Sequence, residues 1–318
     1  MAKILLDYFF PITAISPTPQ ASTAFLKQVL AVVKPKDGVT PGTVTLCTSS
    51  SAVAALTDNA EVAQLFAGGL SRVYVLPMAT LDIATVLETE GSNFFTILIS
   101  SDFTDANITG DLDLGAWKGV VGVSSNDDAV FLKAQAVIEN RCAFYASTAN
   151  KAKNMFYAFG KLLSNAVNWT NQQYIAMPLA DDVATLGDAN ALFDDKISFV
   201  ISDDEFGKRL GLFCAGGKAI TAPYIVRNLE IDLQSKALQY ISGNQPSYTL
   251  TQAALLEDEL QKVISGDVGN PGYIGRQWIE AGVVEVKLEQ ENFVASGYIN
   301  ISEPKAMWRI FGEIRQTL

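Results

Sequence analysis

The sequence predicts an α/β fold with a mixed, largely parallel sheet flanked by helices, C-terminal antiparallel strands and an extended arm at each end. Three observations lead to this prediction. β-rich runs alternate with helical patterns over residues 43–202, which is typical of a largely parallel sheet. These runs are continuously apolar, as in strands covered on both faces. After residue 205, glycine-rich connections, one clear helix and terminal strands replace the alternation.

Seven short runs rich in β-branched and aromatic residues are the expected strands of the α/β part. They span residues 43–48, 72–77, 94–100, 119–124, 142–147, 174–178 and 197–202.

Three helices are expected between these strands. Asn59 is a candidate cap for the first, which places Val62, Leu65 and Phe66 on one face. Asn126 is a candidate cap for the second, which has acidic residues in its first turn. The third falls within residues 153–167 and carries apolar residues at helical spacing, namely Met155, Phe159, Leu162 and Ala166.

Paired glycines at Gly68-Gly69 lie between the first helix and the 72–77 strand. Phosphate-binding glycine loops run from a strand into a helix, so that the helix N-terminus faces the anion. Here the order is reversed. We therefore expect Gly68 to end the helix in the left-handed conformation, which glycine enters without a Cβ clash.

The C-terminal third has its own pattern. A helix begins near Thr251, with an acidic run over residues 257–259 facing water and with Leu256, Leu260, Val263 and Ile264 facing inward. A glycine- and proline-rich loop is expected over 267–275, followed by antiparallel strands at 283–289 and 293–302. These boundaries suggest an N-terminal arm (1–20), an α/β domain (21–204), a second part of the core (205–302) and a C-terminal arm (303–318).

Composition excludes several classes of function. The net charge of −11 argues against non-specific binding of nucleic acid, which needs Lys and Arg to neutralise phosphates. The absence of histidine removes Ser-His-Asp and Cys-His catalysis and His-ligated metals. An apolar content of 49% with 18% charged residues fits either burial against other subunits or a large internal core.

No cofactor or metal site is expected. Cys47, Cys142 and Cys214 lie far apart in apolar runs and suggest neither disulfides nor zinc. The segment 211–219 resembles a P-loop, but Leu212 stands where the motif requires its first glycine and Ala219 replaces the hydroxyl residue. Acidic pairs such as Asp194-Asp195 lie beside helix starts and loops, which favours helix caps and solvated turns over a metal site.

The two chain ends combine bulky apolar residues with a preference for extended structure. Pro11, Pro17 and Pro19 prevent a long helix in the N-terminal segment. Asp7 and Pro11 also interrupt it before a signal-peptide core or a membrane span, which favours a soluble protein of a reducing cytoplasm. The ends either pack on their own domain or add strands to neighbouring subunits.

The order of segments resembles that of the tail sheath proteins of contractile-tailed bacteriophages and related injection machines. The resemblance rests on "NAEVAQLFAGGLSRVYVLP" (59–77), "FFTILISS" (94–101), "RCAFYAST" (141–148), and "GNPGYIGRQWIEAGVVEVKLE" (269–289) with the residues after it. It covers most of the chain and includes no catalytic signature. The chain is short for such a subunit, so a minimal sheath and a sheath-like protein of a non-contractile tail are both open.

The resemblance implies a structural, non-enzymatic subunit that forms stacked hexameric rings around an inner tail tube, in a virion tail assembled in the bacterial host cytoplasm. Baseplate and tail terminator proteins would be further partners, with neither nucleic acid nor a membrane. The implied inter-subunit anchors are Ile4, Leu5, Tyr8, Phe9, Trp308, Ile310 and Ile314. Lys305, Arg309 and Arg315 would face an acidic tube surface or act as ordinary solvated charges.

Two other classes stay open on the residues alone. An α/β enzyme or small-molecule-binding protein would use the carboxyl edge of the sheet. Another oligomeric virion protein, such as a tube or baseplate component, is the third candidate.

Overall fold

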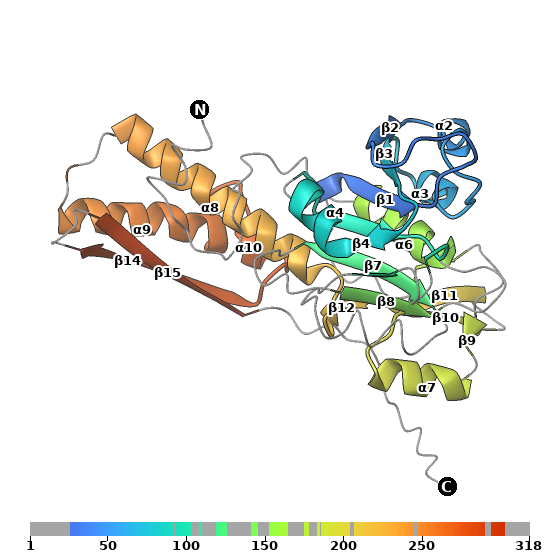
Figure 1. Ribbon diagram of the computed structural model, residues 1–318. Coiled ribbons are helices and arrows are strands. Elements are labelled where there is room, and N and C mark those ends of the chain that lie inside the picture. The colour runs from blue at the N-terminus through green and yellow to red at the C-terminus, as the bar shows by residue number, and fades with distance from the viewer. Residues whose placement is uncertain are drawn as a thin grey trace, which may run out of the picture.

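The computed structural model describes residues 26–91, 93–103, 108–109, 119–125, 141–145, 153–164, 175–177, 183–184, 186–203, 207–244, 247, 249–289 and 294–302. The described part is elongated (Figure 1). The α/β part lies at one end, and an extension made of α8, α9, β14 and β15 projects from it. The ten residues that we expect to form arm and tube contacts all lie outside the described residues.

The α/β part is built on a six-stranded sheet with the strand order β2-β3-β1-β5-β7-β8. Every pairing is parallel except that of β2 with β3, which is antiparallel. The predicted largely parallel sheet is therefore confirmed. The strands are β1 (Val29–Val33), β2 (Thr45–Cys47), β3 (Val73–Pro77), β5 (Thr96–Ile99), β7 (Val120–Ser125) and β8 (Arg141–Tyr145).

The central strand β1 is missing from the seven predicted strands, so the expectation that the alternation begins near residue 43 is wrong. All five residues of Val29–Val33 are buried, and the strand pairs with β3 on one side and β5 on the other. A short apolar run without alternation cannot be assigned by periodicity, because buried helices and buried strands share that pattern.

The helices of this part are α2 (Ser50–Ala54), α3 (Ala63–Ala67), α4 (Ile83–Glu90), α6 (Lys153–Ser164) and α7 (Leu186–Asp194). The helix predicted within 153–167 is confirmed as α6, and Met155, Phe159 and Leu162 are buried. Asn59 does not cap α3, because its side chain accepts the N–H of Glu61 at 2.7 Å and the helix starts only at Ala63. The helix predicted after Asn126 lies outside the described residues.

The glycine pair ends α3 as expected, but the two glycines have different roles from those predicted. Gly68 has φ −70°, whereas Gly69 has φ +115° and takes the left-handed region. Gly68 instead allows α3 to approach α6, because a Cβ on it would lie 2.7 Å from the Cα of Gly160. A Cβ on Gly160 would in turn lie 2.7 Å from the carbonyl oxygen of Leu65.

A smaller sheet with the order β11-β10-β9 continues from the edge of the central sheet. Its strands are β9 (Val183–Ala184), β10 (Phe199–Asp203) and β11 (Gly207–Leu212). Ser198 joins the two sheets, because its N–H donates to Ala143 at 2.8 Å and its carbonyl accepts from the N–H of Tyr145 at 2.7 Å. The remaining short strands are paired as β4 (Leu81–Asp82) with β6 (Ile108–Thr109), and β12 (Cys214–Ala215) with β13 (Lys218–Ala219).

The longest described helix, α8 (Ala222–Asn244), contradicts the expectation of a single clear helix after residue 205. Its buried residues include polar ones, Arg227, Asn228 and Gln234, beside apolar ones. A helix that buries side chains of both kinds presents no single apolar stripe in the sequence. For this reason, the sequence pattern of residues 222–244 does not predict a helix.

The rest of the extension consists of α9 (Leu250–Ser265), α10 (Gly272–Gly275), β14 (Ala281–Glu289) and β15 (Val294–Ser302). The Thr249 hydroxyl caps α9 by accepting the N–H of Gln252, and the predicted Leu256, Leu260 and Ile264 are buried. The predicted pair of antiparallel strands is confirmed. The loop expected over 267–275 is only partly right, because residues 272–275 form α10.

One buried apolar cluster runs through both parts of the molecule, from β1 to α9 and Val284 of β14. α8 is fastened to the central sheet by a hydrogen bond of 2.7 Å between the hydroxyls of Tyr224 and Thr96, both buried. The ring of Tyr224 also packs edge-on against Phe95, with centroids 5.1 Å apart. The extension is thus rooted in the same core as the sheet. The domain boundaries stay predictions.

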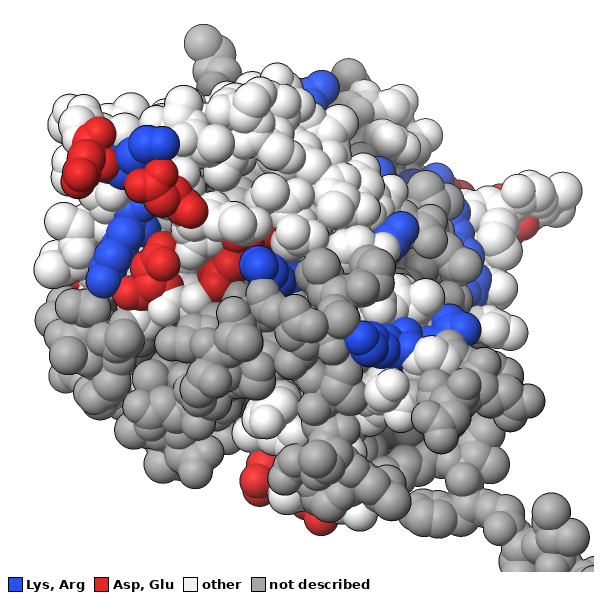
Figure 2. Space-filling view, turned by 90° about the vertical axis from the view of Figure 1, so that its right-hand side faces the viewer, with Lys and Arg blue, Asp and Glu red and all other residues white. Residues whose placement is uncertain are grey.

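Charges are unevenly distributed over the described surface at the α/β end. Figure 2 shows this end, where Lys, Arg, Asp and Glu gather in small groups and a broad part of the described surface, at the top of the view, carries almost no charge. This matches the low fraction of charged residues in the sequence.

Candidate assembly surface

The candidate functional surface is the two-stranded sheet of β14 and β15 at the side of the extension (Figure 1). The strands pair over nine residues each, from Ala281 opposite Ser302 to Glu289 opposite Val294. Among the described residues, neither strand pairs with any other strand. A sheet of two strands has two edges, and an edge whose backbone groups are unpaired is a template for a strand from another chain.

On β14, one face packs on α9 and the other is exposed. Val284 is buried against the core, and a Cβ on Gly282 would lie 2.8 Å from Ile264 of α9. On the opposite face Val283 is 63% exposed, and Glu285 and Lys287 form an exposed ion pair at 3.1 Å. Within the described part of the chain, β14 is therefore held by α9 from one side.

Polar side chains of α9 reach the backbone of β14. The Gln261 side chain donates to the carbonyl of Gly282 at 3.0 Å and accepts the N–H of Val284 at 2.9 Å. The Glu257 carboxylate accepts the N–H of Val286 at 2.8 Å. The expectation that Glu257 faces water is therefore wrong, since its carboxylate faces a strand edge that the sequence pattern does not reveal.

An ion pair between Lys236 and Glu259 ties α9 to α8 on its other side. The Glu259 carboxylate lies 2.7 Å from both Lys236 of α8 and Lys262 of α9. These hydrogen-bonded ammonium groups, Lys236 first, lower the pKa of Glu259 to about 2. Lys262 also pairs with Asp258 at 2.8 Å. Such partly exposed pairs contribute little stability individually but fix the orientation of side chains.

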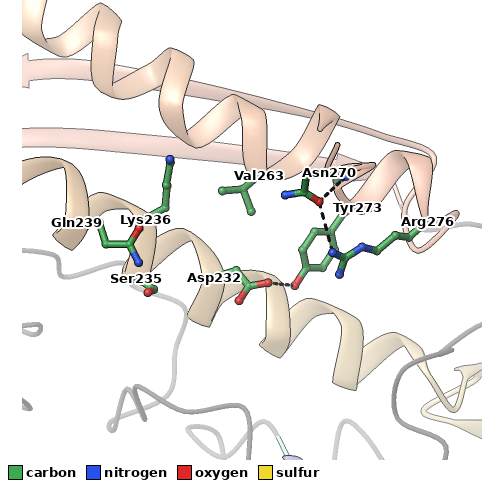
Figure 3. A pocket seen from close by; sticks show the side chains of 9 residues that line it. Asp232, Ser235, Lys236, Gln239, Val263, Asn270, Tyr273 and Arg276 are labelled. Atoms are coloured by element: carbon green, nitrogen blue, oxygen red, sulfur yellow. Dashed lines mark hydrogen bonds between the residues drawn. The ribbon is translucent and has the colours of Figure 1, made fainter. Parts of the chain in front are cut away.

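A pocket of about 280 Å³ lies where α8, α9 and α10 meet (Figure 3). The hydroxyl of Tyr273 donates to Asp232 at 2.7 Å and contacts the amide of Asn228. Burial and the neighbouring carboxylate of Asp232 raise the pKa of Tyr273, so the phenol stays protonated. The pocket is lined by Asp232, Ser235, Lys236, Gln239, Val263, Asn270, Gly272, Tyr273 and Arg276.

A second polar cluster lies at the carboxyl end of β5, where α/β proteins place ligands. Glu61 is only 6% exposed and accepts hydrogen bonds from the backbone and hydroxyl of Ser101 and from Asn59. The Asn59 amide also donates to Asp102 at 2.8 Å. Burial, chiefly, raises the pKa of Glu61 to about 7. These bonds are internal, so the cluster links the start of α3 to the end of β5.

The P-loop-like segment is a hairpin. Gly216 and Gly217 have φ of 56° and 77° and join β12 to β13 in a two-residue turn. Two consecutive positive φ values are typical of a tight hairpin turn. The segment therefore lacks the strand-to-helix connection that a P-loop needs to present amides to phosphate.

The three cysteines are buried and unpaired with one another. In the described ranges, no group of three or more Cys, Asp or Glu side chains is placed to hold a metal ion. The same ranges contain no helix whose length and apolar character would suit a membrane crossing.

The β14–β15 pair is predictable from the sequence, but the residues that shape it are not. Gln261 and Glu257 act through backbone groups of a distant strand, and no local pattern marks that role. The anchors at Ile4, Leu5, Tyr8, Phe9, Trp308, Ile310 and Ile314, and the tube contacts at Lys305, Arg309 and Arg315, lie outside the described residues and stay predictions.

Comparison with known proteins gives matches in structure alone. No protein-family model and no curated protein matches the sequence. A chain in the cryo-EM structure of the anti-feeding prophage (AFP) baseplate, 6-fold symmetrised, matches with a TM-score of 0.65 and 13% identity, over 95% of this chain and 96% of that one.

Two further chains come from contracted states of the same particle. One, from the AFP helical sheath in the contracted state, has a TM-score of 0.59 and 14% identity, over 96% of this chain and 97% of that one. The other, from the AFP baseplate in the contracted state, has a TM-score of 0.59 and 14% identity, over 93% and 94%. The chain thus has, over nearly its whole length, the fold of chains found in the helical sheath and baseplate of the anti-feeding prophage.

Proposed function

We propose that this chain is a structural, non-enzymatic subunit of a tail sheath, which assembles with copies of itself into stacked hexameric rings around an inner tail tube. The observation that carries the proposal is the match with a helical-sheath chain over 96% of this chain and 97% of that one. A match confined to the α/β sheet would fit many functions, because such sheets serve unrelated proteins. The match with the helical-sheath chain covers 96% of this chain and therefore includes the extension of α8, α9, β14 and β15.

The proposal assigns the joining of subunits to the two arms. Residues 1–20 and 303–318 add strands to neighbouring copies, and the two-stranded sheet of β14 and β15 receives them. Linked arms keep a mesh continuous while subunits reorient. Lys305, Arg309 and Arg315 face the tube. Baseplate and tail terminator proteins bind the ends of the polymer, which belongs to a virion tail assembled in the bacterial cytoplasm.

The first test is electron microscopy of the purified full chain at high concentration, alone and after addition of tail tubes. We expect rings or tubular polymers, because the proposal gives each subunit both donor arms and a receiving sheet. A chain that stays monomeric at high concentration and after seeding with tubes would contradict the proposal.

The second test separates assembly from folding. Removal of residues 306–318 should leave a subunit with unchanged circular dichroism and an unchanged cooperative unfolding transition, but one that no longer polymerises. Loss of the unfolding transition would instead show that the C-terminal segment packs on its own subunit. Polymerisation at the wild-type level would remove this arm from the mechanism.

A further inference from the structure

The strand order of the central sheet reverses between β1 and β5. The next parallel strand after β1, which is β3, lies on one side of it, and β5, β7 and β8 follow on the other side. Open α/β sheets bind their ligands outside the carboxyl ends of the strands at such a reversal point. The N–H of Ser100, directly after β5, still donates to the carbonyl of Val32 in β1 at 3.0 Å. The next residue, Ser101, therefore lies at the reversal point.

The carboxylate of Glu61 accepts three hydrogen bonds at this point. The backbone N–H of Ser101 donates to Oε2 at 3.0 Å, and the Ser101 hydroxyl donates to Oε1. The Asn59 amide donates to Oε2 at 3.3 Å. Ser101 thus binds both carboxylate oxygens, one with its backbone and the other with its side chain, and Asn59 supplies the third donor.

These three donors are uncharged, and within the described part of the chain no Lys or Arg forms an ion pair with Glu61. Burial, the largest effect, raises the pKa of Glu61 to about 7, whereas the hydrogen bonds from Ser101 and Asn59 lower it. The donors therefore stabilise the charged form of a buried carboxylate. Hydrogen bonds from neutral donors to an ionised acceptor are stronger than those between neutral groups.

We infer that Ser101 and Asn59 form a carboxylate-binding site at the reversal point of the sheet, and that Glu61 of the same chain fills this site as a built-in ligand. The site is thus closed in the wild-type protein. Once the Glu61 side chain is removed, the site binds a short free monocarboxylate in its place. This inference does not depend on the proposed assembly, because it concerns the α/β part of a single subunit.

Acetate is the carboxylate that fits the space left by Glu61→Ala. The substitution keeps the Cβ and removes a methylene and the carboxylate, which acetate replaces with a methyl group and a carboxylate. Acetate can enter because Asn59, Ser101 and Asp102 are only partly buried. The carboxylate of Asp102, which accepts the same Asn59 amide at 2.8 Å, disfavours an anion of higher charge such as phosphate.

Chemical rescue of the full chain tests the inference. The Glu61→Ala protein is unfolded by urea at about pH 8, in sodium acetate or in sodium chloride at about 100 mM. A ligand that binds only the folded state multiplies the folding equilibrium constant by one plus the ratio of its concentration to its Kd. We expect acetate to raise this constant at least about threefold over chloride, which corresponds to a Kd of about 50 mM or less.

Two variants serve as matched controls. Glu61→Gln keeps the site filled, so acetate should affect it no more than it affects the wild type. Adding Ser101→Ala to Glu61→Ala removes the hydroxyl donor, and the gain from acetate should fall to the wild-type level. Equal stability of Glu61→Ala in the two salts would overturn the inference. So would a Glu61→Ala chain that folds in neither salt, or a gain from acetate that Ser101→Ala leaves unchanged.

Discussion

The contact between α3 and α6 makes a quantitative prediction for Gly160→Ala. A Cβ at this position would lie 2.7 Å from the carbonyl oxygen of Leu65 and 2.9 Å from the Cα of Gly68. Both are backbone atoms, so no side-chain rotation can relieve the overlap, and the helices must separate. Overpacking of a core costs about 1–3 kcal/mol, and we take the upper end because backbone must move.

Helix propensity acts in the opposite direction. Alanine inside a helix is favoured over glycine by about 1 kcal/mol, which leaves a net loss of about 2 kcal/mol in the free energy of unfolding for Gly160→Ala. Gly243→Ala is the matched control. Gly243 lies in the last turn of α8 with nothing within 4 Å of its ideal Cβ, so the same substitution should be neutral or stabilising by up to about 1 kcal/mol.

Urea unfolding monitored by circular dichroism measures both variants against the wild type. The midpoint of Gly160→Ala should fall with an unchanged slope, and that of Gly243→Ala should stay level or rise. A Gly160→Ala protein as stable as the wild type would refute the argument that the two glycines are required by a backbone contact between helices.

Three further predictions follow from other parts of the molecule. Because the folded state raises the pKa of Glu61 from 4.5 to about 7, the folded protein binds more protons than the unfolded chain between these values, and its stability falls as the pH rises through them. The free energy of unfolding of Glu61→Gln minus that of the wild type should therefore increase by about 2–3 kcal/mol from pH 5 to pH 8, measured by urea titration; a flat difference would contradict this. Tyr273→Phe removes the hydroxyl that donates to Asp232 while keeping the ring contact with Trp278, so unfolding should become easier by about 1–3 kcal/mol, and a neutral result in the same titration would show that the hydroxyl is dispensable. If Lys305, Arg309 and Arg315 face the tube, their joint change to Glu should abolish co-sedimentation with tail tubes but leave self-assembly intact, whereas unchanged co-sedimentation would reduce them to solvated charges.

The sequence revealed most of the α/β part because local patterns suffice there. Continuous apolar runs such as 94–100 predict buried strands, and the spacing of Met155, Phe159 and Leu162 predicts a helix with a buried face. β1 was not predicted because all five of its residues are buried, so it lacks the polar and apolar alternation that marks a half-buried strand. α8 was not predicted because it buries polar residues, Arg227, Asn228 and Gln234, beside apolar ones and so shows no single apolar stripe.

The candidate surface was likewise predictable from the sequence only in part. The β14–β15 pair was predictable, because two β-rich runs flank a short polar turn. Which of its strands is bonded by α9 was not predictable. That depends on Gln261 and Glu257, which lie on another element and act on backbone atoms more than 20 residues away.

By itself, the sequence determined the fold class, the exclusion of histidine-based chemistry and the resemblance to sheath proteins, because composition and local periodicity are properties of the chain alone. The tertiary structure decided which glycine ends α3 and which one meets Gly160, which carboxylate is buried, and which edge of the two-stranded sheet α9 covers. These features arise from contacts between segments distant in sequence, and such contacts exist only once the elements have packed.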